Sequence, residues 1–153
     1  PAAGDATAEF DKILALNKKL AKVMAGIKTL DDLKKYRPDY VKLNIEILKL
    51  TLASLRKAVK LSPEQLKAYV ARQKAMNKAN AEFGKNMMAM QKRIMKIEGA
   101  QKFIAATQKE LAEKLKPLTK EMTELTKIYM KKVMPQKNQG GDKVAPRPAP
   151  QKK

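Results

Sequence analysis

The stretch LSPEQLKAYVARQKAMNKANAEFGKNMMAMQKRIMKIEG, residues 61–99, has the beginning, the apolar side and the end of one long helix. Ser62 is placed as the N-cap, Pro63 as the first helical residue and Gln65 as the partner in a capping box. Apolar residues recur at alternating spacings of three and four, as on one side of a helix. That side comprises Leu66, Tyr69, Gln73, Met76, Asn80, Phe83, Met87, Met90, Ile94 and Ile97. Gly99 is expected to end the helix.

The same spacing on both sides of this stretch predicts three further helices. The first carries Phe10, Ile13, Asn17, Leu20, Met24 and Ile27. The second is apolar on two sides, with Leu33, Tyr36, Tyr40, Leu43, Ile47 and Leu50 on one and Val41, Ile45, Leu48, Leu52, Leu55 and Val59 on the other. The last carries Ile104, Gln108, Leu111, Leu115, Leu118, Met122, Leu125 and Tyr129. Thr29 and Asp32 form a capping pair, Pro38 is expected to open the main part of the second helix, and Pro117 to kink or split the last.

Short connections between these helices predict an all-α, antiparallel up-down helical bundle with three long helices and a shorter first one. The predicted organisation is a flexible N-terminus at 1–7, the bundle at 8–134 and a disordered basic Pro/Gly/Lys tail at 135–153. An alternative is an intermolecular coiled coil, in which the hairpin of the last two helices pairs with a second copy. A homodimer therefore stays open.

The composition argues against an enzyme. The chain of 153 residues has no cysteine and no histidine, and its only serines are Ser54 and Ser62. Catalytic triads, thiolate metal sites and histidine–carboxylate metal sites cannot be built from such residues, and no Gly-rich phosphate loop is present. We therefore expect no catalytic residues, no metal site and no cofactor. No apolar run is long enough for an integral membrane segment.

The formal net charge of +19 favours anionic partners. One row of lysines lies opposite the apolar side of residues 61–99 and is the candidate partner-binding site. It consists of Lys67, Lys74, Lys78, Lys85, Lys92 and Lys96. It is either a row of positive charge for an extended polyanion or an anionic surface, or the ordinary solvated face of an amphipathic helix. Neither an arginine cluster nor interleaved aromatic residues accompany it, so base recognition is not supported.

Methionines and polar residues give two further candidates. Met88 and Met95 lie on an apolar flank of the predicted helix. Methionine clusters can bind Cu(I), offer an adaptable surface to apolar partners, or pack in a core; without cysteine or histidine, the core is favoured over the metal. The polar residues within the apolar sides either fix the register of the helices or line a cavity. They are Asn17, Gln73, Asn80 and Gln108.

Two stretches resemble known groups of bacterial proteins. Leu61, Ser62 and Gln65 resemble the Leu-Thr-x-x-Gln motif of Spy-like periplasmic chaperones, with serine in place of threonine, and residues 118–122 resemble a degenerate second copy. That resemblance implies a small, basic, all-helical, enzymatically inactive protein that binds unfolding clients. Residues 11–50 look like small exported all-helical bacterial proteins of unknown function. The opening residues PAAGDATAEF are typical of a mature end left by signal cleavage, although a Met-Pro start that loses its methionine leaves the same residue.

We therefore expect a non-enzymatic binding protein of the bacterial envelope or secreted space, either periplasmic or secreted. It is expected to engage proteins or anionic polymers through its basic helical surface, in a chaperone-like way. The alternatives are a sequence-independent nucleic-acid-binding protein, which would favour the cytoplasm, and a structural subunit of a larger assembly.

Overall fold

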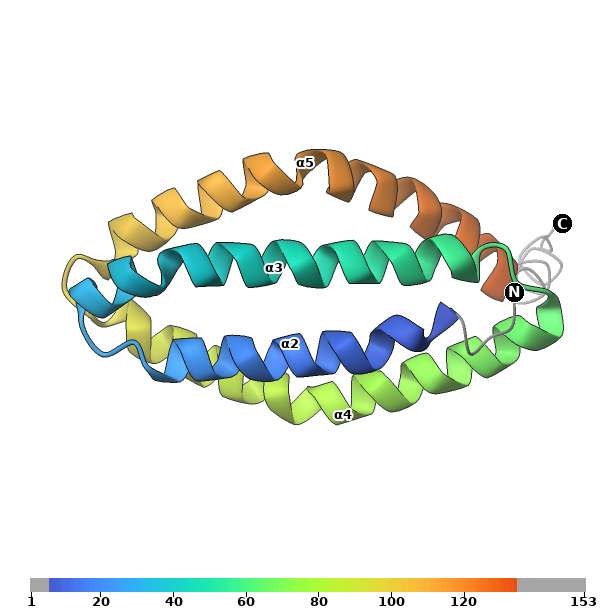
Figure 1. Ribbon diagram of the computed structural model, residues 1–153, viewed down its shortest axis with the longest axis horizontal. Coiled ribbons are helices and arrows are strands. Elements are labelled where there is room, and N and C mark those ends of the chain that lie inside the picture. Colours follow the sequence, from blue (N-terminus) through green and yellow to red (C-terminus); the bar gives the residue numbers. More distant parts are fainter. Residues whose placement is uncertain (1–5, 135–153) are drawn as a thin grey trace, which may run out of the picture.

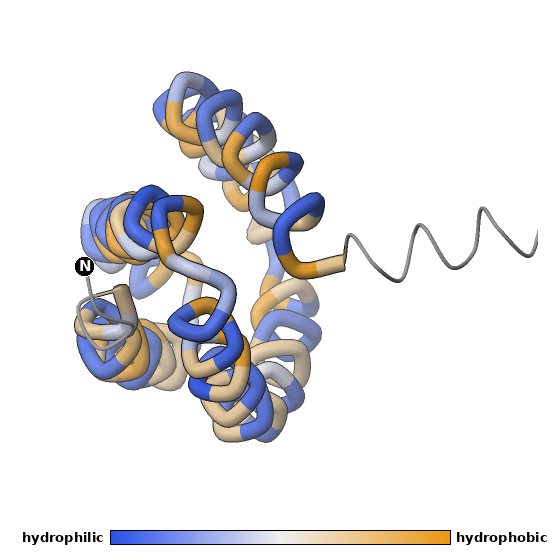
Figure 2. The backbone as a smooth tube through the Cα atoms, turned by 90° about the vertical axis from the view of Figure 1, so that its right-hand side faces the viewer, coloured by the Kyte–Doolittle hydropathy of each residue, from blue (hydrophilic) through white to orange (hydrophobic). Residues whose placement is uncertain are grey.

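The computed structural model describes residues 6–134, which form a bundle of four helices (Figure 1). They are α2 (Ala8–Ala25), α3 (Leu30–Ala58), α4 (Pro63–Met95) and α5 (Ala100–Val133). The all-α fold with three long helices and a shorter first one is confirmed. Every helix carries alternating hydrophobic and hydrophilic positions (Figure 2), as expected for helices that each turn one side to the core. The predicted tail at 135–153 and most of the predicted flexible N-terminus lie outside the described residues.

Local signals in the sequence place the helix ends. The Thr29 and Ser62 side chains accept hydrogen bonds from the backbone N–H groups of Asp32 and Gln65, whose side chains accept in return from the two N-cap residues. Both predicted capping pairs are thus present. The expectation that Gly99 ends the long helix is wrong, because α4 already ends at Met95. Gly99, at φ +80°, is instead the N-cap of α5, and a Cβ atom there would lie 3.1 Å from Leu30 Cδ2.

Neither internal proline breaks its helix. The sequence predicts that Pro38 opens the main part of the second helix, but α3 is one helix from Leu30 and continues through Pro38 without a break. The helix tolerates Pro38 because the residue is exposed, so water can hydrate the carbonyl group that lacks a partner N–H. Pro117 also lies inside an unbroken helix, and α5 bends near its middle instead of dividing (Figure 1).

The predicted pairing of neighbouring helices differs from the pairing in the structure. α2 packs on α3 and runs antiparallel to it, since Glu9 near the start of α2 pairs with Lys57 near the end of α3. The other neighbours of these two helices are α4, which packs along α2, and α5, which packs along α3. Both of these pairs run parallel. Arg37 and Arg56 of α3 bind Glu110 and Glu121 of α5 in the same order along the chain, and Asn17 and Met24 of α2 bind Asn80 and Arg93 of α4 in the same order. Although four residues join α3 to α4, the two helices therefore lie on a diagonal.

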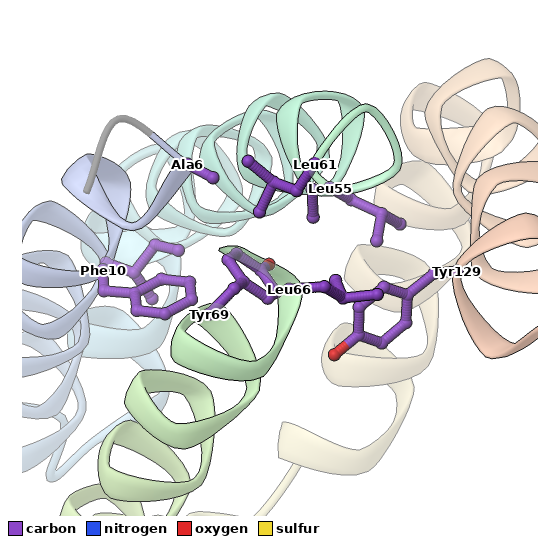
Figure 3. Close-up of a cluster of buried hydrophobic side chains, with 9 residues drawn as sticks. Ala6, Phe10, Leu55, Leu61, Leu66, Tyr69 and Tyr129 are labelled. Atoms are coloured by element: carbon purple, nitrogen blue, oxygen red, sulfur yellow. The ribbon is translucent and has the colours of Figure 1, made fainter. Parts of the chain in front are cut away.

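Buried residues form two clusters at opposite ends of the bundle. The tyrosine cluster contains Ala6, Phe10, Ile13, Leu55, Ala58, Leu61, Leu66, Tyr69 and Tyr129 (Figure 3). The cluster at the other end, here called the methionine-end cluster, contains Leu20, Met24, Ile27 and Ile94. Between Tyr69 and Ile94, no residue of α4 is fully buried. The predicted apolar side of α4 does face inward, but its central residues are only half-buried, because α4 and α5 bow apart there (Figure 1).

The polar residues of the apolar sides join different helices to one another. Asn17 of α2 donates to Asn80 of α4 at 3.4 Å, and Gln108 of α5 donates to the Tyr40 hydroxyl of α3 at 3.1 Å. Gln73 accepts from the Tyr129 hydroxyl at 2.8 Å. Each bond links two helices at one height only, so Asn17, Asn80 and Gln73 favour the role of fixing register. Gln108 also lines a pocket, which is the other role considered for these residues.

The burial of Tyr129 predicts a loss of stability at alkaline pH. Burial, together with the nearby Tyr69, raises the pKa of Tyr129 to about 12 from an ordinary value of 10. Because the folded state holds this proton more tightly, its contribution is fully present below pH 10 and is lost as the pH rises towards 12. Urea unfolding between pH 9 and 12 should show this loss, and Tyr129→Phe should reduce it. An equal pH dependence in both proteins would contradict the assignment.

Candidate binding surfaces

The six predicted lysines occupy the solvent-facing side of α4 and its C-cap. All six are exposed, whereas the residues of the predicted apolar side of α4 are buried or half-buried. None of the four ion pairs within residues 6–134 includes any of them. From Lys67 to Lys96 the row extends over roughly 44 Å at the rise of an α-helix. Glu64 and Glu82 are the acidic residues of α4, so the face has a strong excess of positive charge.

The two flanking methionines differ in their surroundings. Met88 is 61% exposed and lies outside both buried clusters, while Met95 is 40% exposed and lines a pocket. Neither is covered by another helix to the extent of a core residue. No group of histidine, cysteine, aspartate or glutamate side chains suited to a metal ion occurs in residues 6–134. Met88 and Met95 are thus available to apolar partners.

A pocket of about 300 Å³ opens near the methionine-end cluster, where all four helices approach one another. Its apolar lining is Met24, Ile27, Leu33, Tyr36, Tyr40, Ile94, Met95, Phe103 and Ile104. Its polar lining is Arg37, Gln91, Thr107 and Gln108. Met24, Ile27, Ile94 and Thr107 are buried, whereas Gln91, Met95 and Gln108 are exposed. The mouth of the pocket therefore lies between α4 and α5.

Two arginines shape this end of the bundle. Arg93 of α4 donates hydrogen bonds to the carbonyl oxygens of Ile27 at 2.6 Å and Met24 at 3.1 Å. Those carbonyls lie at and just beyond the C-terminal end of α2, where a cation also interacts favourably with the helix dipole. Arg37 lies over the ring of Phe103, 5.0 Å from its centre, and binds Glu110. These contacts hold α2 to α4 and α3 to α5.

Glu110 joins two cations at the pocket wall. It binds Arg37 and also Lys114, whose Nζ lies 2.8 Å from its carboxylate. The hydrogen bonds from Lys114 and Arg37 lower the pKa of Glu110. The carboxylate is therefore ionised at neutral pH, and the three side chains carry one net positive charge.

The sequence pattern located the lysine row and the exposed methionines but did not place the pocket, although Gln108, which lines it, was among the polar residues considered for a cavity. The pocket depends on which helices are neighbours, and the prediction differed from the structure on that point. In residues 6–134 no helix is long and apolar enough to cross a membrane. No protein-family model matches the chain, and no curated protein or solved structure shows significant similarity to it.

Proposed function

We propose that the chain is a non-enzymatic binding protein of the bacterial envelope or secreted space that engages an extended anionic polymer or an acidic protein through the lysine row of α4. The observation that carries this proposal is the set of six exposed lysines along one face, none of which is part of an ion pair within residues 6–134. An extended polyanion that follows the row releases counterions at each contact, which supplies affinity without requiring a shaped site.

Neutralising the row should abolish most of this binding. The variant replaces Lys67, Lys74, Lys78, Lys85, Lys92 and Lys96 by glutamine. Binding of poly-L-glutamate is measured between 50 and 200 mM salt, a range over which six contacts should weaken wild-type binding by roughly two to three orders of magnitude. The row variant should bind weakly at every salt concentration, with a much shallower salt dependence.

A control of equal charge separates the row from the net charge. It replaces six exposed lysines of the other helices by glutamine: Lys18, Lys22, Lys34, Lys49, Lys116 and Lys127. This control should retain most of the binding and most of the salt dependence. Equal losses in both variants would show that only net charge matters and would refute the row as a site. A strong preference for single-stranded DNA over poly-L-glutamate would favour the nucleic-acid alternative instead.

The chaperone-like part of the proposal is supported by apolar side chains that the bundle leaves accessible. Met88 and Met95 are exposed on α4, and the central apolar residues of that helix are only half-buried. Flexible methionine side chains adapt to apolar partners of different shapes. The protein should suppress aggregation of an unfolding client at equimolar ratio, and Met88→Gln with Met95→Gln should weaken this effect. Unchanged aggregation in the presence of the wild type would refute it.

A further inference from the structure

We propose that the pocket between the four helices binds the apolar chain of an anionic amphiphile, with the charged head group held at its mouth between α4 and α5. A fatty acid is the simplest such ligand. The pocket is a different surface from the lysine row, although Lys92 and Lys96 of that row also contribute to the positive charge of this end of α4. It rests on three properties of the pocket: its shape and lining, its cationic wall and the charges around its mouth.

The shape and lining suit a slender apolar chain. A volume of about 300 Å³ lies at the lower end of the range of small-molecule pockets, which are typically apolar with a few polar groups. Here the floor consists of buried Met24, Ile27 and Ile94, and the only buried polar residue of the lining is Thr107. The Thr107 hydroxyl already donates to the Phe103 carbonyl oxygen at 2.9 Å, so the floor presents little that would require a polar ligand.

The wall of the pocket supplies the positive charge. Arg37 is the only charged residue of the lining. Its partner Glu110 is shared with Lys114, so one positive charge of the three side chains is not neutralised. Arginine offers five N–H donors, more than its contact with Glu110 uses, and can therefore bind a carboxylate in addition.

Cations also predominate on the helices around the mouth. In the sequence, Lys92 and Lys96 directly follow the pocket residues Gln91 and Met95, and Lys102 and Lys109 directly flank the pocket residues Phe103 and Gln108. All four are exposed and take part in no ion pair within residues 6–134. Such a field attracts an anionic head group and disfavours a cationic one.

Calorimetric titration with three amphiphiles of equal chain length tests the proposal. Laurate, neutral dodecyl maltoside and cationic dodecyltrimethylammonium are each used below the concentration at which they form micelles. Laurate should bind with one chain per protein, the neutral amphiphile more weakly and the cationic one least. Equal binding of all three, or no binding of laurate, would overturn the proposal.

Two pairs of variants localise the binding. Ile104→Trp fills the pocket and should lower laurate affinity at least about tenfold, whereas Leu118→Trp, at a half-buried position of the same helix outside the pocket, should change it little. Arg37→Met should weaken laurate by about tenfold but leave dodecyl maltoside unchanged. Glu110→Gln breaks the same ion pair but keeps the arginine, so it should not weaken laurate. Folding of each variant is checked by its thermal transition.

Two further measurements distinguish the pocket from a membrane-binding surface and from the lysine row. Binding to phosphatidylglycerol vesicles without binding of monomeric laurate would assign the pocket region to a membrane surface and overturn the proposal. The six-lysine row variant removes Lys92 and Lys96, which also contribute charge near the pocket, so it cannot separate the two surfaces. Poly-L-glutamate binding is therefore measured on Ile104→Trp. That variant should keep its polymer binding, which separates failure of the pocket from failure of the lysine row.

Discussion

Replacing Tyr69 by alanine should lower the free energy of unfolding by about 3–5 kcal/mol, the usual range for removing a large aromatic side chain from a core. Tyr69 is 2% exposed and lies between two other rings (Figure 3). Its ring centre is 5.4 Å from that of Phe10 and 5.9 Å from that of Tyr129. The alanine would leave a cavity where α2, α4 and α5 meet.

The hydroxyl of Tyr69 has a separate and smaller effect. Ser54 donates to the Ala6 carbonyl oxygen at 2.5 Å, and its hydroxyl oxygen accepts from Tyr69 at 3.0 Å. Tyr69→Phe removes only this second bond and should cost about 1 kcal/mol. Tyr36→Ala, at a half-buried tyrosine, is the matched control and should cost roughly 1–2 kcal/mol. Urea unfolding measures all three, and equal effects of Tyr69→Ala and Tyr36→Ala would contradict the assigned core.

Replacing Leu52 by alanine should lower the free energy of unfolding by about 2–5 kcal/mol. Leu52 is 1% exposed and is among the most deeply buried side chains of residues 6–134. It belongs to the second of the two apolar sides of α3. The loss combines the transfer of the side chain to water with the cavity that remains.

Leu48, one turn earlier on the same side of α3, provides the control for Leu52. It is half-buried, so Leu48→Ala should cost only roughly 1–2 kcal/mol. The comparison is made by urea unfolding at constant pH. If the Leu48 variant were the more destabilised of the two, the burial pattern of α3 would be wrong.

The caps and the inner sides of single helices could be predicted from the sequence better than the packing of the helices against one another. Helix caps depend on residues three positions apart, so Thr29 with Asp32 and Ser62 with Gln65 could be read directly. Apolar spacing likewise identified the inner side of α4. Which helices are neighbours depends instead on contacts between residues far apart in the sequence, such as Lys57 with Glu9, 48 residues apart, and Arg37 with Glu110, 73 residues apart. No local pattern carries that information.

The candidate surfaces follow the same division. The lysine row is a property of one helix, and its exposure could be predicted from spacing alone. The pocket needs Arg37 from α3, Gln91 from α4 and Phe103 from α5 at one place, so it could be found only from the structure. Pro38 shows that a local signal can also mislead. Proline is a strong signal for a helix boundary, but α3 continues through it because packing on its neighbours stabilises the surrounding helix.

The absence of fully buried residues between Tyr69 and Ile94 has a consequence for the dynamics of α4. Local opening of a helix costs little free energy where few apolar side chains leave the core. The backbone amides in the middle of α4 should therefore exchange with solvent deuterium through brief separations that leave both ends of the helix in place. Amides of α3 near Leu52 should exchange only when the whole bundle unfolds. The part of α3 around Leu52 should thus stay protected from exchange, while α4 opens at its centre and remains packed at both ends.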